Sequence, residues 1–301
     1  MIGARPRRDE ADPNLISSRD NRWLKLFRAA LSSTGPRESE PLVAEGLKIV
    51  EEGFRSGLEA EALLVSSSGE RELERLLRIA AESEAGISCS RVLRTSDRLF
   101  ASVSGTESPQ GVAALFRAPV WGLEDVLRGS SSASLPACDS ARGRSPLVIV
   151  LSGVQDPGNV GTIIRSAEAF GGTGVVATKG TADPWSQKSI RASAGSAFRL
   201  PLLRGMSLHV LLAQLKLNQV QIVAASSRRY NNATADESQR ILRDAVAIFI
   251  GNEAAGLPGE VEHAADARIT IPISEAVDSL NAGIAASLLL YEAARQRRSG
   301  S

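Results

Sequence analysis

Two uninterrupted apolar runs constrain the fold more than any other feature of this chain. Residues Leu147–Leu151 read LVIVL and residues Val246–Ile250 read VAIFI, and both have the length and β-branched content of strands. A strand without polar side chains is typical of a parallel sheet that helices cover on both faces. A helical pattern follows the first run, and another strand-like run lies at Gly174–Thr178. This alternation predicts an α/β domain with a mainly parallel sheet.

The first part of the chain carries a second, smaller α/β pattern. Apolar residues recur at helical spacing between Trp23 and Leu31, and a further helix is predicted over Val43–Phe54. Short strand-like runs alternate with these helical segments. We therefore expect a separate α/β domain over residues 15–118.

Composition suggests where the two domains begin and end. Residues 1–14 are polar and charged with two prolines, so we expect a disordered arm. Residues 119–145 are rich in serine, alanine and glycine, so we expect a flexible linker. Residues 146–297 then form the second domain, and 301 residues suffice for two domains.

Charge and cysteine content exclude few classes of function. The formal net charge is only +1, which neither supports nor excludes an RNA partner. No apolar run approaches the roughly 20 residues of a membrane helix, and the polar N-terminus does not resemble a secretory signal. Cys89 and Cys138 are far apart, and His209 and His263 are isolated. We expect reduced thiols in a cytosolic protein, no metal site and no membrane partner.

Three polar loops follow or join the predicted strands and helices of the second domain. The first, residues 156–161, reads DPGNVG, with Arg165 further along the predicted helix. The second begins with Gly-Asn-Glu at Gly251–Glu253 and continues with Gly-Leu-Pro, and the third is Ser-Leu-Asn at Ser279–Asn281. The C-terminal ends of parallel strands lie at one edge of a sheet, where ligands bind. Each loop on its own could equally be a capped turn, with Asn159 as one such cap.

The segments around the third loop carry their own predictions. Residues Ile269–Ile273 form an apolar run that predicts a strand before this loop. After the loop, Ile284, Leu288 and Tyr291 lie at i, i+4 and i+7, which predicts a helix with one apolar face. The first loop, in turn, offers a glycine-rich turn that a ligand could approach closely. It matches neither the dinucleotide fingerprint nor the P-loop.

Taken in order, the three loops resemble the three motifs of the SpoU/TrmH branch of the SPOUT methyltransferases. The matching positions are Asn159, Gly161 and Arg165, then Gly251-Asn252-Glu253 with Gly256-Leu257, then Ser279-Leu280-Asn281, and the likeness spans about Leu147 to Arg295. The resemblance implies S-adenosylmethionine as cofactor, ribose 2′-O-methylation of RNA, a deep C-terminal trefoil knot and a homodimer. After the third motif this chain has Ala282-Gly283, where many relatives have Val-Ser or Val-Ala; we expect Gly283 to let a neighbouring segment approach closely.

The N-terminal domain resembles the substrate-binding domain that often precedes this enzyme domain, which has a ribosomal-protein-like α/β fold. The likeness rests on Arg37, on Glu45-Gly46 and on Pro109-Gln110-Gly111. It implies contacts to RNA, and ribosomal RNA is the expected substrate. Transfer RNA, or a catalytically silent RNA-binding protein of the same fold, are the alternatives.

The resemblance assigns roles by position. Arg165 is the family's catalytic position. A guanidinium is normally always protonated, so stabilising developing negative charge is easier for it than removing a proton. The implied residues are Arg165, Asn159, Glu253, Ser279 and Asn281 for catalysis, Gly251, Asn252, Gly256, Ile271 and Leu280 for the cofactor, and Arg37, Glu45 and Gln110 for RNA.

Overall fold

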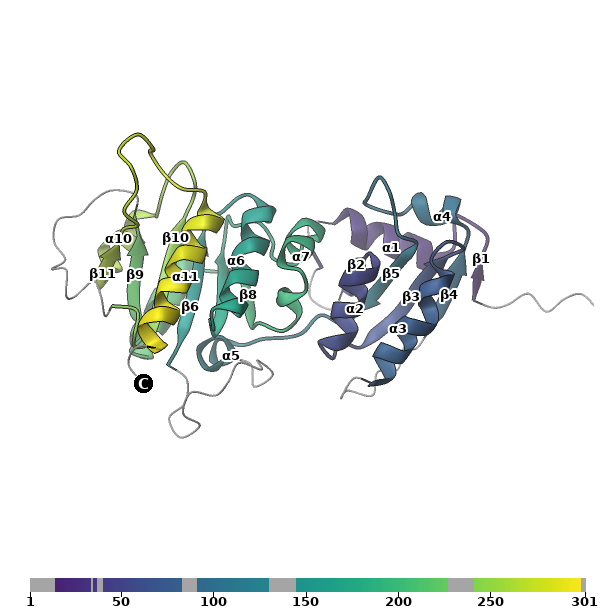
Figure 1. The fold of residues 1–301 in the computed structure, drawn as a ribbon, viewed down its shortest axis with the longest axis horizontal. Helices are drawn as coiled ribbons and strands as arrows, with labels where there is room; N and C mark the ends of the chain where they lie inside the picture. Colours follow the sequence, from purple (N-terminus) through teal and green to yellow (C-terminus); the bar gives the residue numbers. More distant parts are fainter. Residues whose placement is uncertain are drawn as a thin grey trace, which may run out of the picture. The chain divides into compact units, whose positions relative to one another are not determined.

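The computed structural model describes two compact units, which are considered one at a time (Figure 1). The described residues are 14–33, 35–36, 40–82, 91–129, 145–226 and 241–298. The first unit comprises Met1–Ser33 with Glu38–Ala118, and the second comprises Thr34–Arg37 with Pro119–Ser301. Both cysteines, and the expected N-terminal arm up to residue 13, lie outside the described residues.

The first unit contains a mixed five-stranded sheet of order β1-β4-β3-β5-β2. Strands β1, β4 and β3 are parallel, and β5 is antiparallel to both β3 and β2. The strands are β1 (Leu15–Ile16), β2 (Leu42–Glu45), β3 (Ala60–Ser66), β4 (Val92–Thr95) and β5 (Val112–Phe116), and the helices are α1 (Arg22–Ser32), α2 (Leu47–Arg55), α3 (Glu70–Glu82) and α4 (Asp97–Ala101).

The core of this unit confirms the α/β prediction but corrects one element. Helix α1 buries Leu24 and Phe27 against the sheet, as its apolar spacing predicts. The predicted helix over Val43–Phe54 is wrong in its first part, because residues 42–45 pair with β5 as a strand. Gly46 then takes a φ of 97°, which favours glycine and ends the strand, and α2 starts at Leu47.

The second unit contains a fully parallel six-stranded sheet of order β11-β9-β10-β6-β7-β8, as the alternating pattern predicts. The two apolar runs become the neighbouring central strands β6 and β10. Their apolar side chains are almost completely buried, because helices cover both faces. The strands are β6 (Leu147–Ser152), β7 (Gly174–Thr178), β8 (Leu202–Met206), β9 (Gln221–Ala225), β10 (Val246–Gly251) and β11 (Ala267–Ile269).

Helices pack on each face of this sheet. On one face, α5, α8 and α10 contribute Val126, Leu211 and Val261 to a core cluster with Phe249 of β10. On the other, α6 and α11 pack side by side, and α7 packs on α6 (Figure 1). The helices are α5 (Leu123–Arg128), α6 (Pro157–Ala169), α7 (Gln187–Ser193), α8 (Leu208–Leu217), α10 (Gly259–Ala264) and α11 (Ala282–Arg298), with a short 3₁₀ helix at Ser196–Phe198.

The expected linker over 119–145 is wrong in its first part. Residues Leu123–Arg128 form α5, and Val126 is fully buried, because its apolar side chain completes the core beside β6 and β7. Residues 130–144 lie outside the described residues. Within the described ranges, no helix is both long and apolar enough to cross a membrane.

Gly161 lies in the turn that was expected to let a ligand approach closely. In the structure it instead permits the close packing of α6 on α7. A Cβ atom at this position would lie 2.4 Å from the carbonyl oxygen of Ser189 and 2.5 Å from the Cβ of Ala192. We expect Gly161→Ala to lower the free energy of unfolding by about 1–3 kcal/mol through overpacking. Chemical denaturation measures this change. Gly259→Ala, where a Cβ meets open space, is the control; equal stability of both variants would show that α7 moves aside freely.

Candidate active site

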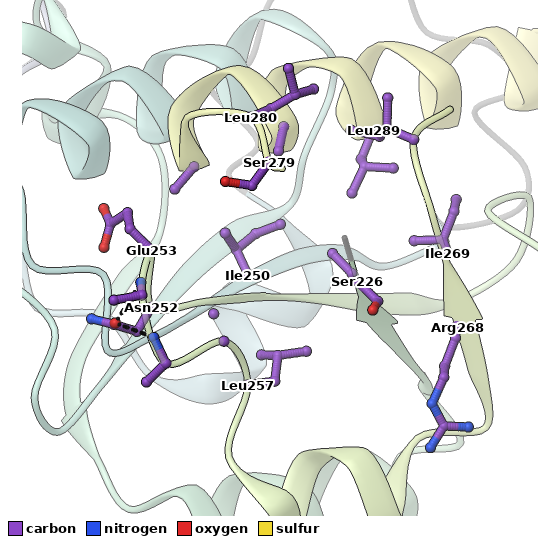
Figure 2. A pocket seen from close by; sticks show the side chains of 18 of the residues that line it. Ser226, Ile250, Asn252, Glu253, Leu257, Arg268, Ile269, Ser279, Leu280 and Leu289 are labelled. Carbon is purple, nitrogen blue, oxygen red and sulfur yellow. Dashed lines mark hydrogen bonds between the residues drawn. The ribbon is translucent and has the colours of Figure 1, made fainter. Parts of the chain in front are cut away.

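A cavity of about 580 Å³ lies at the C-terminal edge of β9, β10 and β11 (Figure 2). The ends of β9 and β10, the loop after β10, the segment after β11 and the start of α11 enclose it. Ligands bind at this edge of open parallel sheets. The cavity therefore lies where the polar loops predicted it.

The loop after β10 is held in shape by Asn252. Its backbone exchanges hydrogen bonds of 3.0 and 2.9 Å with Gly256, and its side-chain oxygen accepts from the backbone N–H groups of Ala254 and Ala255 at 2.9 and 2.8 Å. Its side-chain amide donates to the carbonyl of Gly153 at 2.8 Å. Asn252 lines the cavity as expected, but its side chain holds the loop. Several residues of this loop that line the cavity are small, Gly251 and Gly256 among them.

A chain of hydrogen bonds joins the three polar loops. The amide of Asn159 donates to Glu253 Oε1 at 2.9 Å, and the amide of Asn281 donates to Asn159 Oδ1 at 2.9 Å. Asn159 is only 9% exposed. Glu253 lies 94 positions and Asn281 lies 122 positions from Asn159 in sequence, so the fold brings together three residues to which the resemblance assigns catalysis.

This network also corrects the expected helix cap. Asp156, not Asn159, caps α6 by accepting from the N–H of Gly158 at 3.1 Å. Pro157 occupies the first helical position, which suits its fixed φ. A hydrogen bond from Lys188 lowers the pKa of Asp156 below its usual value, so the cap stays ionised. Asn159 lies within the first turn, where its side chain is free to bond Glu253.

The third loop closes the cavity from the side of α11. Ser279 and Leu280 line it, and Asn281 Oδ1 accepts from the N–H of Gly283 at 2.9 Å. Asn281 is therefore both a helix cap and a member of the network. A Cβ on Gly283 would come within 3.3 Å of Thr162 in α6, so the glycine does permit the expected close approach.

One prediction around this loop is wrong. The predicted strand over Ile269–Ile273 is correct only at Ile269, the last residue of β11. Pro272 further on has no N–H group to pair with a neighbouring strand. Ile271 lies beyond the strand and lines the cavity, as expected of a cofactor contact. The predicted helix after the loop is confirmed as α11. Its apolar face is exposed, with Ile284 at 53%, Leu288 at 44% and Tyr291 at 55%.

Arg165 lies on the exposed surface of α6, about one turn after Gly161, the last residue of the first loop. Within the described ranges its guanidinium has no hydrogen bond or ion pair, and it is not part of the cavity lining. Ser166, its neighbour, lies 2.7 Å from Ser287 Oγ of α11. Helix α6 is thus fixed beside α11 while Arg165 faces outward.

In the first unit, two of the expected RNA-binding residues are engaged internally. The buried carboxylate of Glu45 accepts from Thr106 Oγ1 and from the N–H of Gly105, each at 2.9 Å, and also from Ser104. Gln110 Oε1 accepts from the N–H of Leu47 at the start of α2, at 2.8 Å. Arg37 lies outside the described residues. Glu45 and Gln110 thus shape the loops at one end of this unit.

Some cavity residues were missed in the sequence. Ser226 at the end of β9, Glu262 in α10 and Arg268 in β11 all line the wall away from the motif loops. No recurring motif marks them, and only the position of Ser226 at a strand end could have indicated it. Among the described residues, no cluster of three or more histidine, cysteine or acidic side chains could hold a metal ion.

Two family models match the chain. Residues 146–291 match the SpoU rRNA methylase family, and residues 30–114 match an MRM3-like substrate-binding domain. The first match covers the Asn159–Glu253–Asn281 network, and the second covers most of the first unit, from the end of α1 into β5.

Individual relatives match nearly the whole chain. The chain is 30% identical over 277 residues to the 23S rRNA (guanosine(2553)-2′-O)-methyltransferase RlmP of Bacillus subtilis, covering 92% of this chain and 97% of the relative. The SpoU methyltransferase AviRb from Streptomyces viridochromogenes, solved with AdoMet, is 25% identical with a TM-score of 0.73, covering 93% of this chain and 100% of that one. The AdoMet-bound rRNA methyltransferase from Sinorhizobium meliloti is 27% identical with a TM-score of 0.71, covering 93% of this chain and 97% of that one. With its catalytic unit, its substrate-binding unit and its near full-length relatives in agreement, the chain belongs to the SpoU rRNA methylase family.

Proposed function

We propose that this protein transfers a methyl group from S-adenosylmethionine to a ribose 2′-hydroxyl of RNA, with ribosomal RNA as the substrate. The observation that carries this proposal is the Asn159–Glu253–Asn281 network. It joins all three family motifs beside the cavity, and its member Asn159 lies on α6, the helix that also carries Arg165. The family membership and the rRNA methyltransferases among the relatives support it.

The cavity suits a nucleoside cofactor held largely by main-chain groups. A Cβ on Gly251 would lie 2.5 Å from the carbonyl carbon of Gly256, so only glycine permits the loop to fold back here. Apolar side chains, Leu280 and Ile271 among them, line the cavity beside this loop and could pack against the nucleoside. These residues would hold S-adenosylmethionine, whose sulfonium supplies an electrophilic methyl group when bound.

The chain's own groups must make a ribose hydroxyl reactive. A hydroxyl is a weak nucleophile, so charge that develops on its oxygen needs a stabilising partner. Arg165 presents an exposed, permanently charged fork of donors. We assign it to the developing alkoxide or the adjacent phosphate, and we assign the network to holding α6 and both loops in register.

The first unit, residues 15–118, is proposed to bind the RNA and residues 146–297 to carry the chemistry. Glu45 and Gln110 then act by positioning the loops that meet the RNA. Mapping ribose methylation across total RNA, from cells with and without the protein, tests the substrate. Loss at one rRNA nucleotide supports the proposal, loss in transfer RNA replaces the substrate, and no loss contradicts enzymatic function.

A homodimer through α11 is the proposed working form. Ile284, Leu288 and Tyr291 form an exposed apolar stripe, and the Tyr291 ring meets Phe170 of the α6 end edge-on at 5.8 Å between centroids. An exposed apolar stripe on a helix is typical of an interaction surface. A second copy that covers it would also lie close to Arg165 on the neighbouring helix.

We expect Leu288→Glu to shift the protein from dimer to monomer, because it places a charge in the apolar stripe. Analytical ultracentrifugation measures the shift. Leu217→Glu, at a 77% exposed position of α8, is the matched control and should leave the assembly unchanged. A monomeric parent protein would rule the dimer out.

The resemblance also implies the trefoil knot and a cytoplasmic location. Both stay predictions here. A protein that modifies ribosomal RNA in a bacterium would work in the cytoplasm.

A further inference from the structure

The cavity extends beyond the three motif loops to a charged wall. Figure 2 shows Glu253 toward one side of the cavity and Arg268 at the other. Strand β9 separates β11, which carries Arg268, from β10, which ends in Gly251. Two strand spacings amount to roughly 10 Å. A ligand seated on the Gly251 loop therefore needs an extension to reach this wall.

Arg268 and Glu262 form a preorganised ion pair on this wall. Arg268 Nε donates to Glu262 Oε2 at 3.0 Å, and Nη2 donates to the Glu262 backbone carbonyl at 2.7 Å. The two side chains keep 36% and 29% of their surface exposed. Both the positive and the negative group therefore remain accessible at a fixed separation.

We propose that the Arg268–Glu262 pair binds the amino-acid end of the cofactor, with Arg268 toward its carboxylate and Glu262 toward its ammonium. The inference rests on the proposed use of S-adenosylmethionine. Only that end of the cofactor carries both a positive and a negative group on one carbon. Among the described residues that line the cavity, Arg268 is the one cation, and a planar guanidinium matches a carboxylate in two-pronged geometry.

The other charged residue of the described lining supports this choice. Glu253, at the opposite side, accepts a hydrogen bond from the amide of Asn159 and belongs to the catalytic network. No cationic side chain of the described lining lies beside Glu253 to bind a carboxylate. The pair at Arg268 thus gives the cofactor a direction within the cavity.

Two ligands that differ only at the amino-acid end test the proposal. S-adenosylhomocysteine carries that end, whereas 5′-methylthioadenosine lacks it and keeps the nucleoside and the sulfur. Titration calorimetry on the full chain should show that Arg268→Ala and Glu262→Gln weaken S-adenosylhomocysteine binding by about three- to tenfold, the range for partly exposed charged contacts. Binding of 5′-methylthioadenosine should not change.

The controls separate the possible failures. Arg117→Ala breaks an ion pair with Glu59 in the first unit and should change neither affinity. Unchanged 5′-methylthioadenosine binding also shows that each variant is folded around the cavity. Equal weakening of both ligands, or no weakening of either, overturns the proposal. If the parent protein binds neither ligand, the proposed function itself fails.

Discussion

Replacing Arg165 by alanine should lower the rate of methyl transfer by about 100- to 1,000-fold, the usual cost of removing one donor that stabilises developing charge. The affinity for S-adenosylmethionine should stay within about twofold, because Arg165 is not part of the cavity lining. The fold should be unaffected, since this side chain is exposed and has no partner within the described ranges. Single-turnover methylation of the mapped RNA, combined with calorimetry of cofactor binding, measures both quantities.

Arg165→Lys sharpens the assignment, because lysine keeps the charge and loses the planar fork. We expect it to recover only a small part of the rate. A lysine variant with near parental turnover would rule out two-pronged positioning. Lys179→Ala, at an exposed position after β7, controls for the loss of one surface cation.

The second large effect is expected at Gly251, where an alanine should weaken cofactor binding. Its Cβ would lie 2.5 to 2.7 Å from the backbone of Gly256 and Leu257, and backbone cannot rotate away as a side chain can. The loop must then shift, at a cost of about 1–3 kcal/mol. A shift of the groups that hold the cofactor should weaken its binding by about tenfold or more, since each tenfold corresponds to about 1.4 kcal/mol.

Calorimetry with S-adenosylmethionine measures this loss, and Gly259→Ala is the matched control. Gly259 lies eight positions further on, at the start of α10, where a Cβ meets nothing within 4 Å. Parental affinity in Gly251→Ala would show that the loop does not hold the cofactor.

The predictability of this fold followed the strength of the local signal. The runs at Leu147–Leu151 and Val246–Ile250 have one compatible environment, a sheet buried on both faces, and they became its central strands. The single helix predicted over Val43–Phe54 was wrong because a strand and a helix of similar polarity adjoin at Gly46. The φ of 97° at Gly46, which separates them, depends on the tertiary structure. Helix α5 was missed because its burial depends on Val126 finding the core cluster of the second unit.

The sequence predicted which residues gather at the site, but it did not predict which of them bond one another. The motif order placed Asn159, Glu253 and Asn281 in one site, yet nothing in the spacing indicated that they bond one another directly. Asn159 was expected to cap its helix, a role that the nearby Asp156 takes. Arg268 and Glu262 could not be found by motif, because their position depends on how an edge strand meets α10.

The loop from Gly251 to Gly256 has a consequence for inhibition. Asn252 folds this loop on itself, and the loop lines the cavity with glycine and alanine residues. A drug that packs against this loop would meet main-chain atoms that most point mutations leave in place. Resistance would then have to come from a change in loop length, or from substitutions at the charged wall around Arg268, which an inhibitor could be designed to avoid.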